Sequence, residues 1–368
     1  MSKRCLKFVC LACAVVMAAS GCSDDDSVAV VDASVDADIS IDAETDATPT
    51  QDADIHTVTI FHTADEHGWL ESYQAAGSTS IYGGAANIYA WLTDREGFDP
   101  EYHLLLSGGD NWTGPSISTW FAGEPMVAAF NLMGYHASTM GNHEFDFERT
   151  ALAQRIDEAL FPFLSANITY RDTGDPFALA QPWKMFTVDG VRVGVVGLTT
   201  TICAESAHPL HVADLAFEPY RETLEEVVPQ MRDEGAQVVI VLAHVCLYNL
   251  RDALDDLSVE VDLAFGGHCH DMNLDEVDSI PLVSSGWAFR AYSMVFLEYS
   301  WSQEAVVDHT VMQRVVQYDE NETNPVTPNA EMATLVEEWR QRTDDILAQE
   351  IGTTNSGIVR ASWLQANW

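Results

Sequence analysis

Short polar clusters that directly follow predicted β-strands are the feature that most restricts how this chain can fold. Five such clusters occur between residues 65 and 270, and each ends an apolar or β-branched run. Helical patterns separate several of these runs, so strands alternate with helices and an α/β layered fold is expected. Polar side chains at the carboxyl ends of strands meet at one edge of such a sheet, so the five clusters can converge in space.

The apolar patterns also indicate where the elements lie. The expected strands are residues 57–63, 104–107, 162–165, 185–188, 191–198, 238–243, 261–265, 282–285, 292–299 and 305–318. The expected helices are residues 85–92, 124–133, 151–160, 220–232 and 247–257. Asp189-Gly190 is a strong hairpin signal. Hairpins in the second half of the chain predict a mixed sheet or two packed sheets.

The start of the chain has the pattern of an export signal. Lys3, Arg4 and Lys7 precede an apolar run at residues 8–19 that is too short to span a bilayer comfortably, and small residues then lead to Cys22. This pattern resembles a bacterial lipoprotein cleavage box. We therefore expect Cys22 to be lipidated and to anchor the mature chain in a membrane. An ordinary secretory peptide with an incidental cysteine is the alternative.

An acidic segment follows, and the whole chain is acidic. Residues 23–54 hold ten Asp and one Glu but no Lys or Arg, which predicts a disordered spacer. The formal net charge of −40 argues against nucleic acid or an anionic membrane surface as a partner. It would also repel a small phosphate ester at long range, whereas a pair of bound cations would reverse the field locally.

The first two clusters offer carboxylate and imidazole ligands. Asp65 and His67 are two residues apart at the end of a strand, so both can reach one cation while Glu66 points elsewhere. Asp110 follows two glycines, which let the backbone bring its carboxylate close to an ion. One such Asp can bridge two metals. Each cluster taken alone could be a solvated loop or a turn.

Three histidines follow the later strands. His244 ends an apolar run, and His268 and His270 follow a pair of glycines with a spacing of two. Oxygen and imidazole ligands in this mixture suit two hard or borderline cations. Two such ions about 3.5–4 Å apart are an established device for hydrolysing phosphate esters. Taken alone, a histidine such as His244 is more often a core residue.

The cysteines leave two interpretations open. Apart from the signal and Cys22, the chain contains Cys203, Cys246 and Cys269, so at most one intramolecular disulfide can form. Cys246 and Cys269 each lie beside a proposed histidine ligand. Thiolate ligation is therefore conceivable, although the surrounding ligands are rich in oxygen.

The segment Gly-Asn-His-Glu-Phe-Asp at residues 141–146 is the most specific cluster. Asn142 offers a neutral carbonyl ligand, and His143 is placed to donate a proton. Asp146 can hold the other ring nitrogen and favour the imidazolium. A helix cap with a surface histidine is the alternative.

In this order the clusters resemble the calcineurin-like metallophosphoesterases, and specifically their 5′-nucleotidase and UDP-sugar hydrolase branch. The segment 141–146 is a hallmark of that branch, and the similarity runs from His56 to Tyr299 and includes Gly83-Gly84. The resemblance implies a four-layered α/β/β/α sandwich with mixed sheets. It also implies a metal-dependent enzyme that hydrolyses small phosphate esters, with nucleotides as the leading substrates.

Carried over residue by residue, the family pattern implies two metal sites, a bridging ligand and a catalytic dyad. The residues are Asp65, His67 and His270 for the first metal, Asn142, His244 and His268 for the second, Asp110 as the bridge, and His143 with Asp146 as the dyad. A metal-bound hydroxide would attack phosphorus, and His143 would assist the leaving oxygen. Zn, Mn and Fe all suit these two divalent sites.

The end of the chain departs from that branch, whose members carry a second domain that holds the nucleoside. Residues 330–348 resemble the linking helix, and residues 360–368 resemble the opening of the second domain before the chain stops. This is either a fragment or a natural short form, so no base-binding residue is assigned. The expected organisation is a signal peptide at residues 1–22, an acidic tether at 23–54, a catalytic domain at 55–320, and a linker with the start of a second domain at 321–368.

Alternatives for the function share the same site or abandon catalysis. A phosphodiesterase acting on 2′,3′-cyclic nucleotides or nucleotide sugars is the first, and a thiosulfohydrolase-like relative is the second. The third is a non-enzymatic, metal-binding surface lipoprotein. In each case we expect an exported protein of the bacterial cell envelope, facing the periplasm or the cell surface. The sequence leaves its oligomeric state open.

Overall fold

The structure, a computed structural model, describes residues 54–319 and 326–349. The expected signal peptide with Cys22, nearly all of the tether, and residues 360–368 lie outside the described residues. Within the described ranges, no helix combines the length and the apolar character needed to cross a bilayer.

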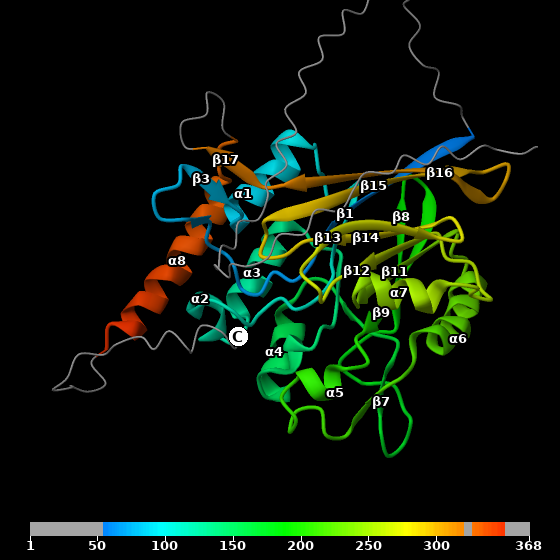
Figure 1. Cartoon of the computed structure of the whole chain (residues 1–368), viewed down its shortest axis with the longest axis horizontal. Coiled ribbons are helices and arrows are strands. Elements are labelled where there is room, and N and C mark those ends of the chain that lie inside the picture. The colour runs from blue at the N-terminus through cyan, green and yellow to red at the C-terminus, as the bar shows by residue number, and fades with distance from the viewer. Residues whose placement is uncertain (1–53, 320–325, 350–368) are drawn as a thin grey trace, which may run out of the picture. The chain divides into compact units, whose positions relative to one another are not determined.

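Two six-stranded mixed sheets form the centre of the fold (Figure 1). The first sheet contains, in spatial order, β16 (Ala305–Val315), β15 (Ala291–Ser300), β1 (Ile55–Thr63), β4 (Leu104–Ser107), β5 (Ala137–Thr139) and β6 (Phe163–Leu164). Strands β1, β4, β5 and β6 run parallel, whereas β15 and β16 pair antiparallel at the other edge.

The second sheet has a similar plan. It contains, in spatial order, β13 (Met272–Val277), β14 (Ile280–Ser285), β12 (Leu263–Gly266), β11 (Val238–His244), β9 (Val191–Thr199) and β8 (Trp183–Val188). The four central strands are parallel, and β8 and β13 close the edges as antiparallel hairpins. At the turn between β8 and β9, Asp189 has a φ of 47° and Gly190 a φ of 82°. Positive φ at both positions is what a two-residue hairpin turn of type I′ requires.

The side chains of the strands point alternately to opposite faces of their sheet, so they contribute to three buried apolar clusters, one between the sheets and one on the outer face of each. Ile60 of β1 and Leu106 of β4 point between the sheets, where they join Ile240 of β11 in one apolar cluster. Phe61 and Leu105, one position away, point to the outer face of the first sheet. Because strand side chains alternate, each sheet buries both faces and needs a helical layer on its outer side.

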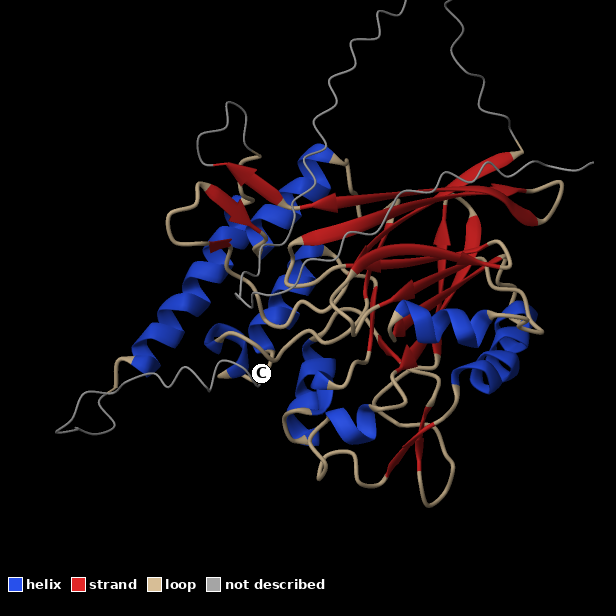
Figure 2. Cartoon of the chain, in the orientation of Figure 1, coloured by secondary structure: helices blue, strands red, loops and turns tan. Residues whose placement is uncertain are grey.

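Helices supply both outer layers (Figure 2). The first sheet is covered by α1 (Ala85–Ala90), a π-helical turn η1 (Trp91–Arg95), α3 (Glu124–Met133) and α8 (Ala330–Leu347). The second sheet is covered by α6 (Tyr220–Asp233) and α7 (Leu247–Leu254). The order helix, sheet, sheet, helix is the four-layered α/β/β/α sandwich that the resemblance implied, and that prediction is confirmed.

Smaller elements surround the sandwich. They are α2 (Ser116–Thr119), the 3₁₀ turn η2 (His143–Phe145), α4 (Arg149–Glu158), α5 (Cys203–Ser206), a sheet of β2 (Tyr73–Gln74), β3 (Ser80–Tyr82) and β17 (Gln317–Asp319), and a pair of β7 (Ile168–Tyr170) and β10 (Leu215–Phe217).

Two expected elements need correction. The strand predicted at residues 305–318 is interrupted at Val316, whose N–H donates to the carbonyl of Arg290 and whose carbonyl accepts from Gly83. These bonds redirect the chain, so β17 joins the small sheet. The helix predicted to end at Leu257 ends at Leu254, because the chain turns extended at Asp255.

Candidate metal centre

All seven predicted ligands lie at, or just beyond, the carboxyl ends of five strands that belong to the parallel parts of the two sheets. They are Asp65 and His67 after β1, Asp110 after β4, Asn142 after β5, His244 at the end of β11, and His268 and His270 after β12. The facing edges of the two sheets thus bring together side chains separated by up to about 200 positions.

Asp65, His67 and His270 form the first group. The Nε2 atoms of His67 and His270 are 2.9 Å apart, and Nε2 of His270 lies 3.7 Å from Oδ1 of Asp65. Two ligands that each sit about 2.1 Å from one ion are roughly 3 Å apart. The spacing therefore fits three ligands around a single cation.

Asp110, His244 and His268 form the second group, and Asp110 connects the two. Oδ2 of Asp110 lies 2.9 Å from Nε2 of His244, which is 3.2 Å from Nδ1 of His268. The same Oδ2 lies 3.8 Å from Nε2 of His67 in the first group. A carboxylate oxygen between two ligand groups is the arrangement that a bridging ligand requires.

Asn142 provides an independent test of whether the residues fit a metal. Its side-chain oxygen is buried and, among the described residues, lacks a hydrogen-bond partner. Buried polar atoms are normally satisfied, so each exception needs an explanation. The next residue along the chain, His143, donates its backbone N–H to Oδ1 of Asp110, so the loop that carries Asn142 contacts the bridging carboxylate. A buried amide oxygen without a partner in this loop has the chemistry of a ligand for a divalent cation, so Asn142 fits a metal site.

Hydrogen bonds orient two of the imidazoles. Nδ1 of His67 donates to the carbonyl of Thr113 at 2.9 Å, and Nδ1 of His244 donates to that of Gly108 at 2.7 Å. These bonds aim Nε2 of each ring at the cluster and leave it as the unprotonated nitrogen of the neutral imidazole. Backbone carbonyls commonly orient metal-bound histidines in this way.

Burial and the carboxylates act in opposite directions on the pKa values of the histidines in the cluster. Burial lowers the pKa of His268 and of His270 to about 4, and it also lowers the pKa of His67. Neutral imidazole is the form that binds metals. At His244, burial lowers the pKa but the carboxylates, Asp110 foremost, raise it to about 10. The field at that point therefore favours a cation.

His143 is in a different situation. Its Nδ1 lies 2.6 Å from Oδ2 of Asp146, and its backbone N–H donates to Asp110. Burial lowers its pKa, but the bond to Asp146 and the charge of Asp110 raise it to about 9. Asp146 and Asp110 thus favour the imidazolium form of the ring. A ring nitrogen of His143 is close enough to His67 and Asp110 to share a metal ion with them. Distance alone therefore does not distinguish His143 from the ligands.

Five of the thirteen described non-glycine residues with positive φ are predicted ligands. Asp65, His67, Asp110, His268 and His270 all have φ between 47° and 72°, in the left-handed region. Side chains other than glycine rarely adopt this conformation, and it persists where the surrounding structure over-determines it. Strain at five of the seven predicted ligands is typical of a functional site.

Sequence comparison agrees with this geometry. The family model for calcineurin-like phosphoesterases matches residues 54–272, more than half of the chain and all seven predicted ligands. This chain belongs to the calcineurin-like phosphoesterase family.

The individual proteins that this chain is similar to support the predicted 5′-nucleotidase branch of the family. UshA from Salmonella pullorum is 34% identical over 230 residues, which are 59% of this chain and 41% of UshA. A 5′-nucleotidase from Vibrio cholerae is 32% identical over 231 residues, or 58% of this chain and 40% of that enzyme. The chain therefore spans about two fifths of the length of these curated relatives.

A solved structure supports the fold. The 5′-nucleotidase precursor from Thermus thermophilus superposes with a TM-score of 0.69 at 22% identity, covering 80% of this chain and 60% of its own.

A buried glutamate near the ligand loops has a role that the sequence did not reveal. The Glu144 carboxylate accepts hydrogen bonds from the backbone N–H groups of Asp110, Asn111 and Gly141, at 2.9, 2.8 and 2.6 Å. It thereby joins the loop after β4 to the loop after β5. Burial raises its pKa to about 7. The hallmark motif contains this residue, but only the fold shows that it aligns two ligand loops.

The structure also decides between the two interpretations of the cysteines that follow the tether. Cys246 and Cys269 form a disulfide, and Cys203 is a buried free thiol. The disulfide joins the loop after β11 to the loop after β12, next to His244 and His268. The alternative of thiolate ligation by this pair is therefore wrong for the structure, because both sulfurs are bonded to each other.

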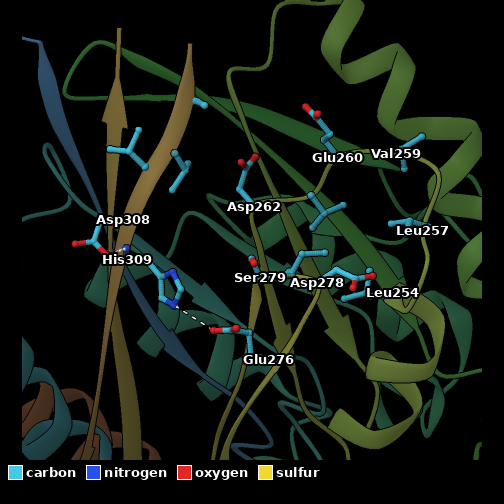
Figure 3. A pocket seen from close by; sticks show the side chains of 15 residues that line it. Leu254, Leu257, Val259, Glu260, Asp262, Glu276, Asp278, Ser279, Asp308 and His309 are labelled. Carbon is cyan, nitrogen blue, oxygen red and sulfur yellow. Dashed lines mark hydrogen bonds and ion pairs between the residues drawn. The ribbon is translucent and has the colours of Figure 1, made fainter. Parts of the chain in front are cut away.

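Two cavities differ in their relation to the cluster. One of about 230 Å³ reaches His268 and is lined by polar and aromatic residues, among them Thr200, Tyr220 and Tyr248. Another, of about 610 Å³, is lined by Glu260, Asp262, Glu276 and further residues that include none of the predicted ligands (Figure 3). Its acidic wall would repel a phosphate ester, so the first cavity is the better candidate for substrate.

Proposed function

We propose that this protein is an exported, lipid-anchored phosphoesterase that uses two divalent cations to hydrolyse nucleotides. One observation carries the proposal. A single carboxylate oxygen of Asp110 lies between two sets of ligands, and the hydrogen-bonded His143–Asp146 pair lies beside it. Both the cations and the acid that phosphate-ester hydrolysis requires would therefore meet at one place.

The residues divide the chemical work. Asp65, His67 and His270 would hold one ion, Asn142, His244 and His268 the other, and Asp110 both. Bound there, Zn, Mn or Fe would polarise phosphoryl oxygens and make a nucleophile of water at neutral pH. His143 would donate its proton to the leaving oxygen, and Asp146 would hold the ring in position and favour its protonated form.

Nucleotides are the substrate class that the relatives favour. The matched relatives include an enzyme named 5′-nucleotidase, but this chain spans only about two fifths of its length. The substrate is therefore proposed from the part that the two share. Diesters such as 2′,3′-cyclic nucleotides, and nucleotide sugars, could use the same centre and are the alternatives to test.

A substrate panel tests the proposal. The protein is stripped with a chelator, reloaded with Mn or Zn, and assayed with AMP, UDP-glucose, 2′,3′-cyclic AMP and bis-p-nitrophenyl phosphate. We expect phosphate release from AMP that depends on the metal. Turnover of the diesters alone would favour the phosphodiesterase alternative. Two bound metals with no turnover of any substrate would contradict the proposal and favour the non-enzymatic metal-binding alternative.

The lipid anchor has a separate test. Cys22→Ala should abolish acylation of the exported protein and move it from the detergent phase to the aqueous phase in a Triton X-114 partition. Unchanged partition would contradict the anchor and leave the phosphoesterase proposal untouched.

A further inference from the structure

Three aromatic rings surround one arginine close to the proposed metal centre. The guanidinium carbon of Arg290 lies 4.6 Å from the ring centroid of Trp287, 5.3 Å from that of Trp69 and 5.0 Å from that of Tyr73. Trp287 stands at 87° to Trp69, and Trp69 at 90° to Tyr73. The rings hold the guanidinium group by cation–π contacts on several sides.

This aromatic cluster is attached to the ligands of the metal centre. The ring of Trp287 stacks on that of His270 with centroids 5.3 Å apart and planes 12° apart. The N–H of Ala288 donates to the carbonyl of Asp65 at 2.9 Å, and that of Gly286 donates to the carbonyl of Asp271 at 2.8 Å. The loop between β14 and β15 is therefore bonded to both segments that carry the first ligand group.

The loop is held in an unusual conformation. Ala288 and Phe289, with φ of 58° and 54°, are consecutive left-handed residues, and both side chains are buried. A Cβ on Gly83 would lie 3.0 Å from the carbonyl oxygen of Ala288 and 3.1 Å from Cγ of Arg290, so only glycine fits there comfortably. Such strain is retained where it positions functional groups. Here it places the ring of Trp287 in contact with both His270 and Arg290.

Arg290 is an unsatisfied cation. In the described ranges, its guanidinium makes no ion pair and no hydrogen bond, whereas Arg149, Arg155 and Arg232 each pair with a carboxylate. The chain has 57 acidic and only 17 basic residues, so acidic partners are abundant. A half-buried guanidinium that keeps its N–H donors unused in this setting is available to an external anion.

From these observations we propose that Arg290, held by Trp69, Tyr73 and Trp287, binds a second phosphoryl group of the substrate. The inference rests on the proposed function, because the first phosphoryl group would lie at the metals. The ring of Trp287 contacts both Arg290 and the ligand His270, with 4.6 Å from its centroid to the guanidinium carbon and 5.3 Å to the imidazole centroid. The guanidinium therefore lies next to the first ligand group, where an anion attached directly to the first phosphoryl group would be its nearest external partner. The ring faces already contact the guanidinium, which favours an anion over a stacked base. Diphosphate esters are the substrate class that this subsite would select.

The test measures binding and does not need turnover. Metal-loaded protein is titrated calorimetrically with methylenebisphosphonate, which resists hydrolysis, and with methylphosphonate. Arg290→Ala should weaken binding of the bisphosphonate about 10- to 100-fold, the usual effect of losing charge-assisted hydrogen bonds. Binding of methylphosphonate should change less than about threefold. Arg290→Lys should recover only part of the difference, because a lysine lacks the planar fork.

Arg95 provides the matched control. It also lies over a tryptophan, 4.4 Å from the ring centroid of Trp91, but its nearest carboxylate, on Glu96, is 4.0 Å away. Arg95→Ala should leave both titrations unchanged. Metal content is measured for every variant. If Arg290→Ala fails to fold, Arg290→Gln keeps a polar side chain of similar length and gives the same comparison.

The outcomes separate the subsite from the proposed function. Equal loss of both ligands, or loss of neither, would overturn the second-phosphoryl subsite even if the wild-type protein hydrolyses AMP. Selective loss of the bisphosphonate, together with a wild-type protein that is inactive on every ester, would overturn the proposed function and leave the subsite standing.

Discussion

At the scale of the residue, the sequence alone predicted the metal ligands, but it did not predict their backbone conformation or the hydrogen bonds that align their loops. Asp65, His67 and Asp110 could be named because ligand-type residues followed predicted strands. Their left-handed backbone could not be predicted, because none of them is glycine. The role of Glu144 was also hidden, since its three donors come from two loops that only the fold brings together.

Asp146→Asn tests the acid. The change weakens the hydrogen bond and removes the Asp146 charge, which together with the charge of Asp110 raise the pKa of His143 to about 9, so this pKa should fall. The protonated ring is the active form, and activity is lost as pH rises through its pKa. The alkaline limb of the kcat/KM profile should therefore move to lower pH, with kcat about 10²- to 10⁴-fold lower at pH 8. Exposed Asp157, changed to Asn, is the control. An unmoved alkaline limb would show that His143 is not the titrating acid.

Glu144→Gln tests the alignment of the ligand loops. An amide offers one acceptor oxygen where the carboxylate accepts three N–H groups, and its NH₂ would face a donor. Affinity for Mn should fall about 10- to 100-fold, as is usual when groups behind metal ligands are changed. Metal titration followed by elemental analysis measures it. Exposed Glu148, changed to Gln, should have no effect, and equal affinity in the two variants would rule out the alignment role.

At the scale of the element, patterns located most strands and helices but not their long-range partners. The segment 238–243 was recognised because it is uniformly apolar, and Asp189-Gly190 because the turn chemistry is local. Strand β13 was missed because five of its six residues, among them Asp275 and Glu276, are exposed at a sheet edge. The pairing of Cys246 with Cys269 depends on β11 and β12 being neighbours, which no local pattern states.

Removing that disulfide should affect both stability and the second ligand group. The crosslink closes a loop across a sequence separation of 23 residues, for which loop entropy gives about 3 kcal/mol of stabilisation. The double variant Cys246→Ser, Cys269→Ser should lose about that much in urea unfolding and should bind its second metal more weakly. Cys203→Ser removes a buried thiol without removing a crosslink. A double variant as stable as the wild type would contradict the structural role.

At the scale of the whole molecule, the charge of −40 and the buried ligand cluster are connected. Asp65 and Asp110 are buried carboxylates in an acidic chain, and burial raises the pKa of Asp65 well above its usual range. Bound cations would neutralise the repulsion between these two buried carboxylates. The sequence could predict the fold, because strand patterns and ligand order agree, but not the aromatic cluster around Arg290, whose members come from separate loops.

Metal removal should therefore destabilise the fold. A cation present at about 1,000 times its dissociation constant stabilises the native state by about 4 kcal/mol. Chelation should lower the Tm measured by calorimetry, and Mn should restore it. In Asp110→Ala, the effect of chelation should be much smaller. A chelator-insensitive wild-type Tm would mean that the cluster does not bind metal tightly.

A two-cation centre bridged by Asp110 is tested most directly by a stoichiometric titration of activity with metal. Chelator-stripped protein receives Mn in fractions of an equivalent, and bound metal and hydrolysis of AMP are measured together. We predict that activity reaches its maximum at two bound ions per chain, and that Asp110→Ala neither binds the second ion nor hydrolyses AMP. Full activity at one ion or none, or an active Asp110→Ala variant, would contradict the bridged centre.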